Sequence, residues 1–173
     1  MYLPQDFIER SVSYLRGGDL EDWLACRLNL EGHRDEAIPH LCREMENGVN
    51  GSRIRAADML GDLGDSTAAP ALVRMLSDQE VGSAAAHSLE CIIKRAEGAE
   101  LDDIWRDLSG NEKKLKGRHS MQELVAALRI SGLKDILSRK RNESRRMEGV
   151  LSERRTMPVL PHTRSMVRGR LTR

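Results

Sequence analysis

Three polar side chains, Glu36, His40 and Glu44, follow one another at intervals of four residues. If the segment is helical, all three share one face, because residues four apart in an α-helix lie one above another. Such a face can bind a metal ion or move protons between carboxyl and imidazole groups. The same spacing is also typical of a solvated surface, and a metal site needs further ligands that the sequence does not identify. We therefore predict no metal site and interpret His40 and Glu44 as part of a partner-binding surface.

Arginine recurs at one position of three similar apolar segments. The segments are 38–45, 69–76 and 101–108, and their arginines are Arg43, Arg74 and Arg106. Because neighbouring residues fill the apolar seam, we expect these arginines to point outward and form a ladder along stacked helices. Guanidinium groups bind carboxylates or phosphates in a bidentate way, so the ladder is a candidate partner-binding surface. The alternative is a salt-bridged surface in which Arg74 pairs with Asp78 and Arg106 with Asp102.

Other signatures of catalysis are missing from the sequence. It contains no glycine-rich phosphate loop, no Ser-His-Asp order and no cysteine–histidine pair that stands out. We predict that the protein is not an enzyme and needs no cofactor. The three cysteines, Cys26, Cys42 and Cys91, are odd in number and lack CxxC spacing, which is typical of reduced thiols in a cytoplasmic protein.

Composition points to a helical protein with an uneven charge distribution. Only 3% of the 173 residues are aromatic, which argues against a β-sandwich or barrel. No apolar run is long enough to span a membrane, and we predict no membrane span. Residues 1–137 carry 17 basic and 24 acidic side chains, whereas residues 138–173 carry 11 and 3. The net charge of +1 therefore conceals an acidic body and a basic C-terminal region.

Apolar residues before position 137 recur with the 3.6-residue period of helices, which places Leu60 and Leu72 in the apolar seam. The glycines at 17–18 and 32 predict helix ends, and Asp19 and Asp65 are suited to begin the next helices. Pro70 and Pro39 are both expected near helix starts, where proline is tolerated. The segments that carry the arginines alternate with other helices at a repeat of about 30 residues, which is typical of an α-solenoid.

The residues from 53 to 72, RIRAADMLGDLGDSTAAPAL, resemble a HEAT-like repeat of the phycobilin-lyase type. They share its Arg-Ala-Ala start, its Leu-Gly-x-Leu-Gly-Asp turn and its Ala-x-Pro-x-Leu second helix. The resemblance is strong over residues 51–78 and fair over 34–50 and 79–108. It implies an all-α, right-handed α-solenoid of HEAT-like helical pairs, and most such repeats are binding surfaces.

Two catalytic roles occur in proteins with such repeats. Some HEAT-like hydroxylases hold a di-iron centre with repeated His-Glu dipeptides, but His87 is followed by serine and no His-Glu dipeptide occurs in the chain. Bilin lyases of this repeat type usually act as two related subunits. No local feature marks a bilin site here, so the lyase subunit stays an alternative.

The C-terminal third combines an apolar stripe with many basic residues. Met121, Leu124, Val125 and Leu128 predict an amphipathic helix that closes the last helical pair. A basic arm follows, and its candidate anion-binding residues are Arg139, Lys140, Arg141, Arg145 and Arg146. From Thr156 the chain has no acidic residue and few apolar ones, so we expect a disordered tail.

These observations predict a HEAT-like solenoid over residues 1–137 and a basic arm and tail over 138–173. The function that we expect is a non-catalytic protein-binding module, such as an adaptor, a scaffold or an inhibitor. The first alternative is nucleic-acid binding through the basic arm and the arginine ladder, although no aromatic residues interleave the arginines for base stacking. The second alternative is the bilin-lyase subunit.

Overall fold

The computed structural model of the chain describes residues 4–17, 19–49, 51–115 and 120–156. This part of the chain is all-helical and contains no strand. The α-helices are α1 (Pro4–Ser13), α2 (Leu20–Glu31), α3 (Arg34–Asn47), α4 (Gly51–Leu63), α5 (Ala69–Met75), α6 (Gly82–Arg95), α7 (Ala99–Leu115) and α8 (Met121–Thr156). Two short 3-10 helices, η1 (Tyr14–Arg16) and η2 (Ser66–Ala68), follow α1 and precede α5. Among the described residues, no helix is both long and apolar enough to cross a membrane.

The helix boundaries follow from local side-chain chemistry. Asp19 begins α2 as predicted, because its carboxylate accepts a hydrogen bond of 2.7 Å from the backbone N–H of Asp22. Asp65 does the same for the N–H of Thr67 at 2.8 Å. The expectation for Pro39 is wrong, since it is the sixth residue of α3, which already begins at Arg34.

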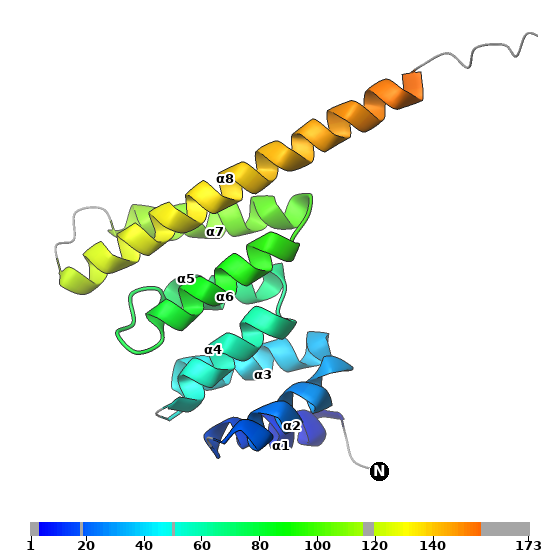
Figure 1. Ribbon diagram of the computed structural model, residues 1–173. Coiled ribbons are helices and arrows are strands. Elements are labelled where there is room, and N and C mark those ends of the chain that lie inside the picture. The colour runs from blue at the N-terminus through cyan, green and yellow to red at the C-terminus, as the bar shows by residue number, and fades with distance from the viewer. Residues whose placement is uncertain (1–3, 18, 50, 116–119, 157–173) are drawn as a thin grey trace, which may run out of the picture.

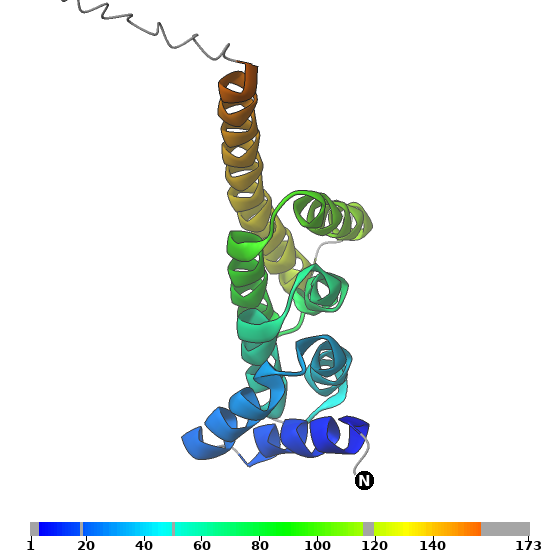
Figure 2. The same cartoon turned by 90° about the vertical axis from the view of Figure 1, so that its right-hand side faces the viewer.

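The helices form two layers that run along the molecule (Figures 1 and 2). One layer contains α1, α3, α5 and α7, and the other contains α2, α4, α6 and α8. The three similar segments of the sequence fall on α3, α5 and α7, so the repeat corresponds to successive helices of one layer. Leu60 and Leu72, which the periodicity places in the seam, are both completely buried.

The contact between α4 and α6 is among the most extensive in the molecule, and it depends on small side chains. A Cβ atom at Gly61 would lie 3.0 Å from the Ser88 hydroxyl oxygen and 3.1 Å from its Cα atom, so only glycine fits without displacing α6. Ser88 is buried, and its hydroxyl donates a hydrogen bond of 2.7 Å to the carbonyl of Ala57. The two helices are therefore joined by close backbone approach as well as by apolar contact.

Cationic side chains cap carbonyls at the ends of neighbouring helices. Each of five Arg or Lys side chains donates to a backbone carbonyl at or near the last turn of another helix: Arg53 to Met45, Arg55 to Leu15, Arg95 to Gly64, Arg129 to Leu76 and Lys140 to Lys94. The last carbonyls of a helix have no partner within it and carry a partial negative charge, so a cation is favourable there. Part of the basic content of the chain is thus structural.

The last helix, α8, differs from its prediction in two ways. It continues without interruption across the predicted boundary between residues 137 and 138. The stripe that the sequence predicts to close the last pair faces outward: Met121, Leu124, Val125 and Leu128 are exposed. The buried face of α8 instead consists of Ala126, Ile130, Leu133 and Leu137, which pack toward α6 and α7. The tail predicted to be disordered lies, from residue 157 on, outside the described residues.

We predict that Gly61→Val lowers the free energy of unfolding by about 1–3 kcal/mol, because the added atoms must displace α6. Gly110→Val in α7 is the matched control, since a Cβ atom at Gly110 meets no atom within 4 Å. We expect this control to change stability by less than about 0.5 kcal/mol. Urea unfolding of both variants measures the difference, and equal stabilities would contradict the close approach of α4 and α6.

Candidate binding site

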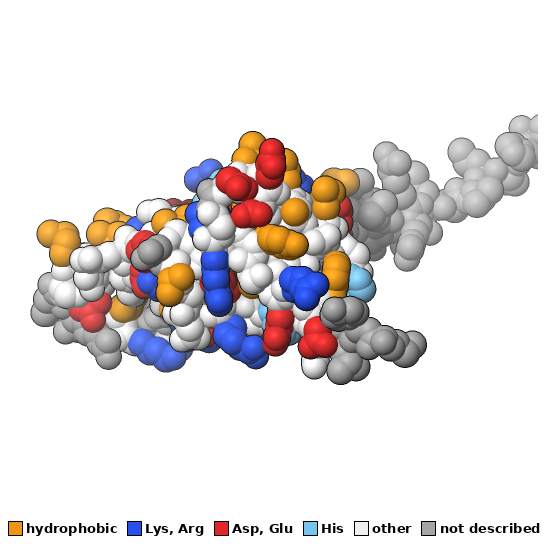
Figure 3. Space-filling view, turned by 90° about the horizontal axis from the view of Figure 1, so that it is seen from below, with side chains coloured by type: hydrophobic (Ala, Val, Ile, Leu, Met, Phe, Trp, Pro, Cys, Tyr) orange, Lys and Arg blue, Asp and Glu red, His pale blue; other side chains and the backbone are white. Residues whose placement is uncertain are grey.

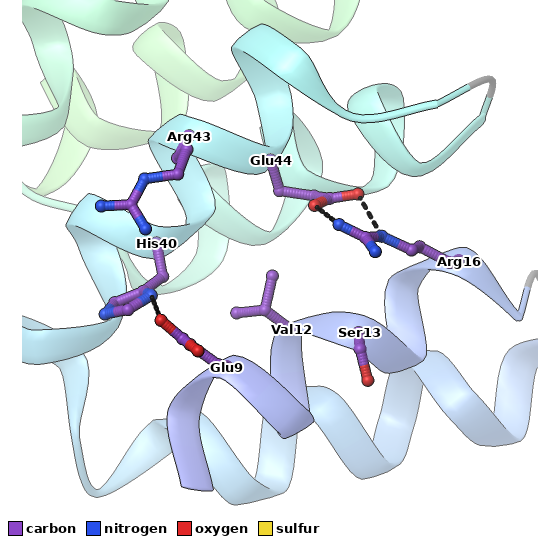
Figure 4. Close-up of a pocket in the computed structure, with 7 residues that line it drawn as sticks. All are labelled: Glu9, Val12, Ser13, Arg16, His40, Arg43 and Glu44. Atoms are coloured by element: carbon purple, nitrogen blue, oxygen red, sulfur yellow. Dashed lines mark hydrogen bonds and ion pairs between the residues drawn. The ribbon is translucent and has the colours of Figure 1, made fainter. Parts of the chain in front are cut away.

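A groove of about 280 Å³ lies between α1 and α3 (Figure 4). It gathers three residues that the sequence singles out: His40, Arg43 and Glu44. The opposite wall comes from Glu9, Val12 and Ser13 of α1 and from Arg16 of η1. The groove therefore combines cationic, anionic and apolar side chains from two helices of the same layer.

Glu44 is the buried charge of this groove. Its side chain is only 7% exposed, and Arg16 donates two hydrogen bonds to its carboxylate, at 3.1 and 2.8 Å. The Ser52 hydroxyl of α4 donates a third, at 2.8 Å. The hydrogen bond from Arg16 lowers the pKa of Glu44 most, burial opposes this effect, and the bond from Ser52 lowers the pKa further. Glu44 is therefore not part of a solvated face, because its carboxylate oxygens accept hydrogen bonds within the fold. Its assignment to a partner-binding surface stays a prediction.

His40 is half-buried, and its Nδ1 atom lies 3.8 Å from a carboxylate oxygen of Glu9 on α1. Glu36, the third member of the predicted face, is exposed and does not line the groove. Glu36 thus faces the solvent, His40 lies in the groove wall and Glu44 is buried. Within the described residues, no group of three or more His, Cys, Asp and Glu side chains is arranged to hold a metal ion.

Arg43 differs from the other charged groups of the groove. Its side chain is exposed, and the structure shows no hydrogen bond or ion pair of its guanidinium with any described residue. Figure 4 shows it beside His40 on α3, whereas both arginine–glutamate bonds lie at the other side of the groove. Because Glu44 is neutralised by Arg16 and Glu9 lies next to His40, Arg43 is the cation that remains for a ligand.

The arginine ladder forms in part. Arg43, Arg74 and Arg106 are exposed, as predicted, on α3, α5 and α7. Arg74 donates to Glu46 of α3, with its Nε atom 3.2 Å away, and Arg106 donates to Asp103 at 2.7 Å.

The predicted partners of the ladder arginines are wrong, because both acids bind other arginines. Asp78 lies 2.6 Å from Arg53, and Asp102 lies 2.6 Å from Arg141. Arg74 and Arg106 therefore pair with acids other than the predicted ones, and the one ladder arginine without a described partner, Arg43, is the one in the groove.

The basic arm is divided between structural and free cations. Arg141 binds Asp102 and lies over the ring of Trp105, with its guanidinium carbon 5.4 Å from the ring centroid, and Lys134 lies over the same ring at 4.7 Å. Lys140 caps the end of α6. Arg139, Arg145 and Arg146 are exposed, and the described residues offer them no ion pair. Arg141 and Lys140 thus hold α8 against the body, which the run of basic residues alone could not indicate.

The cysteines do not provide a reactive thiolate in the groove. Burial raises the pKa of Cys26 to about 12 and that of Cys42 to about 11, so both remain protonated at neutral pH.

The sequence did not indicate Arg16 and Ser52, which are the hydrogen-bond partners of Glu44. Arg16 lies 28 residues before Glu44, so no local spacing could have linked them.

In comparisons with known proteins, no family model, no curated protein and no solved structure matches the chain. The HEAT-like resemblance therefore stays a prediction that rests on the sequence.

We predict that Glu44→Gln lowers the free energy of unfolding at pH 7 by about 1–3 kcal/mol, because charged hydrogen bonds in a buried site are lost. The pKa of Glu44 is lowered in the folded state, so this contribution is present above the ordinary pKa of 4.5 and is lost as the pH falls below it. Thermal unfolding between pH 7 and 3 should show the two proteins converging in acid. Glu36→Gln, an exposed change on the same helix, is the control. A constant difference at every pH would contradict the charged role of Glu44.

Proposed function

We propose that the protein is a non-catalytic protein-binding module built as a short, right-handed α-solenoid of HEAT-like helical pairs. Two features support this architecture: helices alternate between two layers, and similar segments recur on α3, α5 and α7. A repeated array of this kind presents an extended surface formed by one residue position of each unit. The proposed role is that of an adaptor, a scaffold or an inhibitor in the cytoplasm.

The proposed contact site is the groove between α1 and α3. The observation that carries the proposal is an arginine without a described counter-ion, Arg43, at a groove whose other charged groups already face partners. A guanidinium group binds a carboxylate through two parallel hydrogen bonds. Val12 lines the groove but is buried, so the polar side chains form most of its accessible wall. The groove therefore suits an acidic side chain of a partner protein.

Peptide display on the immobilised full-length protein tests this proposal, because the selection itself supplies the ligands. We expect the selected peptides to carry Asp or Glu, and we expect Arg43→Glu to weaken their binding at least about tenfold, since the change replaces attraction by repulsion. Fluorescence anisotropy of labelled peptides measures the affinity. The fold of the variant should be intact, because an exposed arginine contributes little to stability.

Arg106→Glu is the matched control, because Arg106 occupies the equivalent position on α7 and its side chain is 75% exposed. We expect it to leave peptide affinity within about twofold of the wild type. If the peptides bind Arg43→Glu as tightly as the wild type, the groove is not their binding site. Equal losses in both variants would instead favour the whole ladder.

A second candidate function is nucleic-acid binding by α8. Arg139, Arg145 and Arg146 are exposed on a helix that projects beyond the rest of the molecule (Figure 1). Phosphate groups of DNA or RNA attract such a cluster without sequence preference. This candidate uses other residues than the groove, so the two proposals can be tested separately.

If α8 binds nucleic acid, the affinity for a DNA or RNA oligonucleotide falls steeply with salt, since bound counter-ions are released. We predict that replacing Arg139, Arg145 and Arg146 together by glutamine lowers the slope of log affinity against log salt by about 2–3. Arg43→Glu should leave the slope unchanged. Absence of salt-dependent binding in the wild type would remove this candidate.

A further inference from the structure

The outer apolar face of α8, formed by Met121, Leu124, Val125 and Leu128, is a large exposed apolar patch. Met121 is 76% and Leu128 is 73% exposed, although the spacing of the four residues places them on one side of the helix. The opposite side of α8 is already buried against α6 and α7 through Ala126, Ile130, Leu133 and Leu137. A helix that is apolar on two sides is normally covered on both.

Gly132 lies on the same side of α8, four residues after Leu128. A Cβ atom built at Gly132 meets no atom within 4 Å, so nothing in the fold of the chain itself requires glycine there. Glycine is unfavourable inside a helix relative to alanine. Its place next to an exposed apolar stripe is explained if another helix approaches the backbone closely at this point.

We propose that the outer apolar face of α8 binds the same face of a second copy of this chain, with the two helices antiparallel. If the two-fold axis passes between Leu128 and Gly132, the Leu128 side chain of each copy lies next to Gly132 of the other. The face thus contains both the projecting side chain and the space that receives it. An interface of this kind is isologous, which is the commonest form of homodimer.

In this arrangement no charged side chain of the face lies opposite a like charge. Asp135 and Arg139 continue the same side of the helix, and in the antiparallel arrangement they lie opposite Val125 and Met121 of the other copy, so like charges do not meet. The side of α8 that packs on α6 and α7 faces away from this contact and stays covered, and the α5–α6 loop borders the face at Met121 and Val125. Since the stripe has only four apolar residues, the dimer should be weak and dependent on concentration.

Sedimentation velocity of the full-length protein from about 10 µM to about 1 mM tests the proposal. We expect the mass to rise from that of the 19.5 kDa monomer toward twice that value. Leu128→Glu should remain monomeric throughout, with an unchanged helical circular dichroism spectrum.

The matched control is Leu28→Glu on α2, where the leucine side chain is 70% exposed. Figure 3 shows that the face of the molecule seen from below, at the end where α1 and α2 lie, also exposes scattered hydrophobic side chains. Exposure of a leucine is therefore not particular to α8. We expect this control to dimerise like the wild type.

The Gly132→Ala variant tests whether the two α8 helices approach each other closely at this position. At concentrations where the protein is monomeric, alanine should raise Tm by about 2–4 °C, because it favours the helix. The same change should raise the dimer dissociation constant about tenfold, because the added methyl group holds the helices apart. Full dimerisation of Gly132→Ala or of Leu128→Glu overturns the proposed contact. If the wild-type chain stays monomeric up to about 1 mM, a second copy of the chain does not bind this face, and the proposal is wrong.

Discussion

A buried carboxylate needs hydrogen-bond donors, and Glu44 has them in two other elements of the fold. Arg16 lies in η1, which follows α1, and Ser52 lies in the first turn of α4. The cost of removing a carboxylate from water is offset only when its oxygens accept several well-placed hydrogen bonds. The position of α1 on α3, and hence the groove between them, follows from this requirement. The same requirement removes Glu44 and Arg16 from the groups that a ligand can bind and leaves Arg43 available.

Unpaired helix ends impose a second constraint of the same physical kind. Carbonyls at the ends of α3, α4, α5, α6 and η1 are capped by cations from neighbouring helices, and the ring of Trp105 contacts both Lys134 and Arg141. Part of the positive charge of the chain is therefore used to join one helix to the next. A row of arginines in the sequence is consequently a poor guide to a binding surface until their partners are known.

The sequence predicted the elements better than their contacts. Asp19 and Asp65 begin helices because a carboxylate next to free backbone N–H groups is a local interaction, and the helical period placed Leu60 in the core. The burial of Glu44 could not be predicted, since its partner Arg16 is distant in the sequence. The buried side of α8 was also beyond prediction, because the helix has two apolar stripes. Periodicity identifies both stripes but does not tell which one faces the body.

Nuclear magnetic resonance offers the most direct test of Arg43 as the cation that binds a partner. In a titration of the isotope-labelled full chain with a short glutamate-rich peptide, the side-chain Nε–Hε signals report on each arginine separately. Our account predicts that the Arg43 signal shifts with saturation, while those of Arg16 and Arg106, which already bind carboxylates, stay in place. Shifts confined to Arg139, Arg145 and Arg146, with Arg43 unchanged, would contradict it.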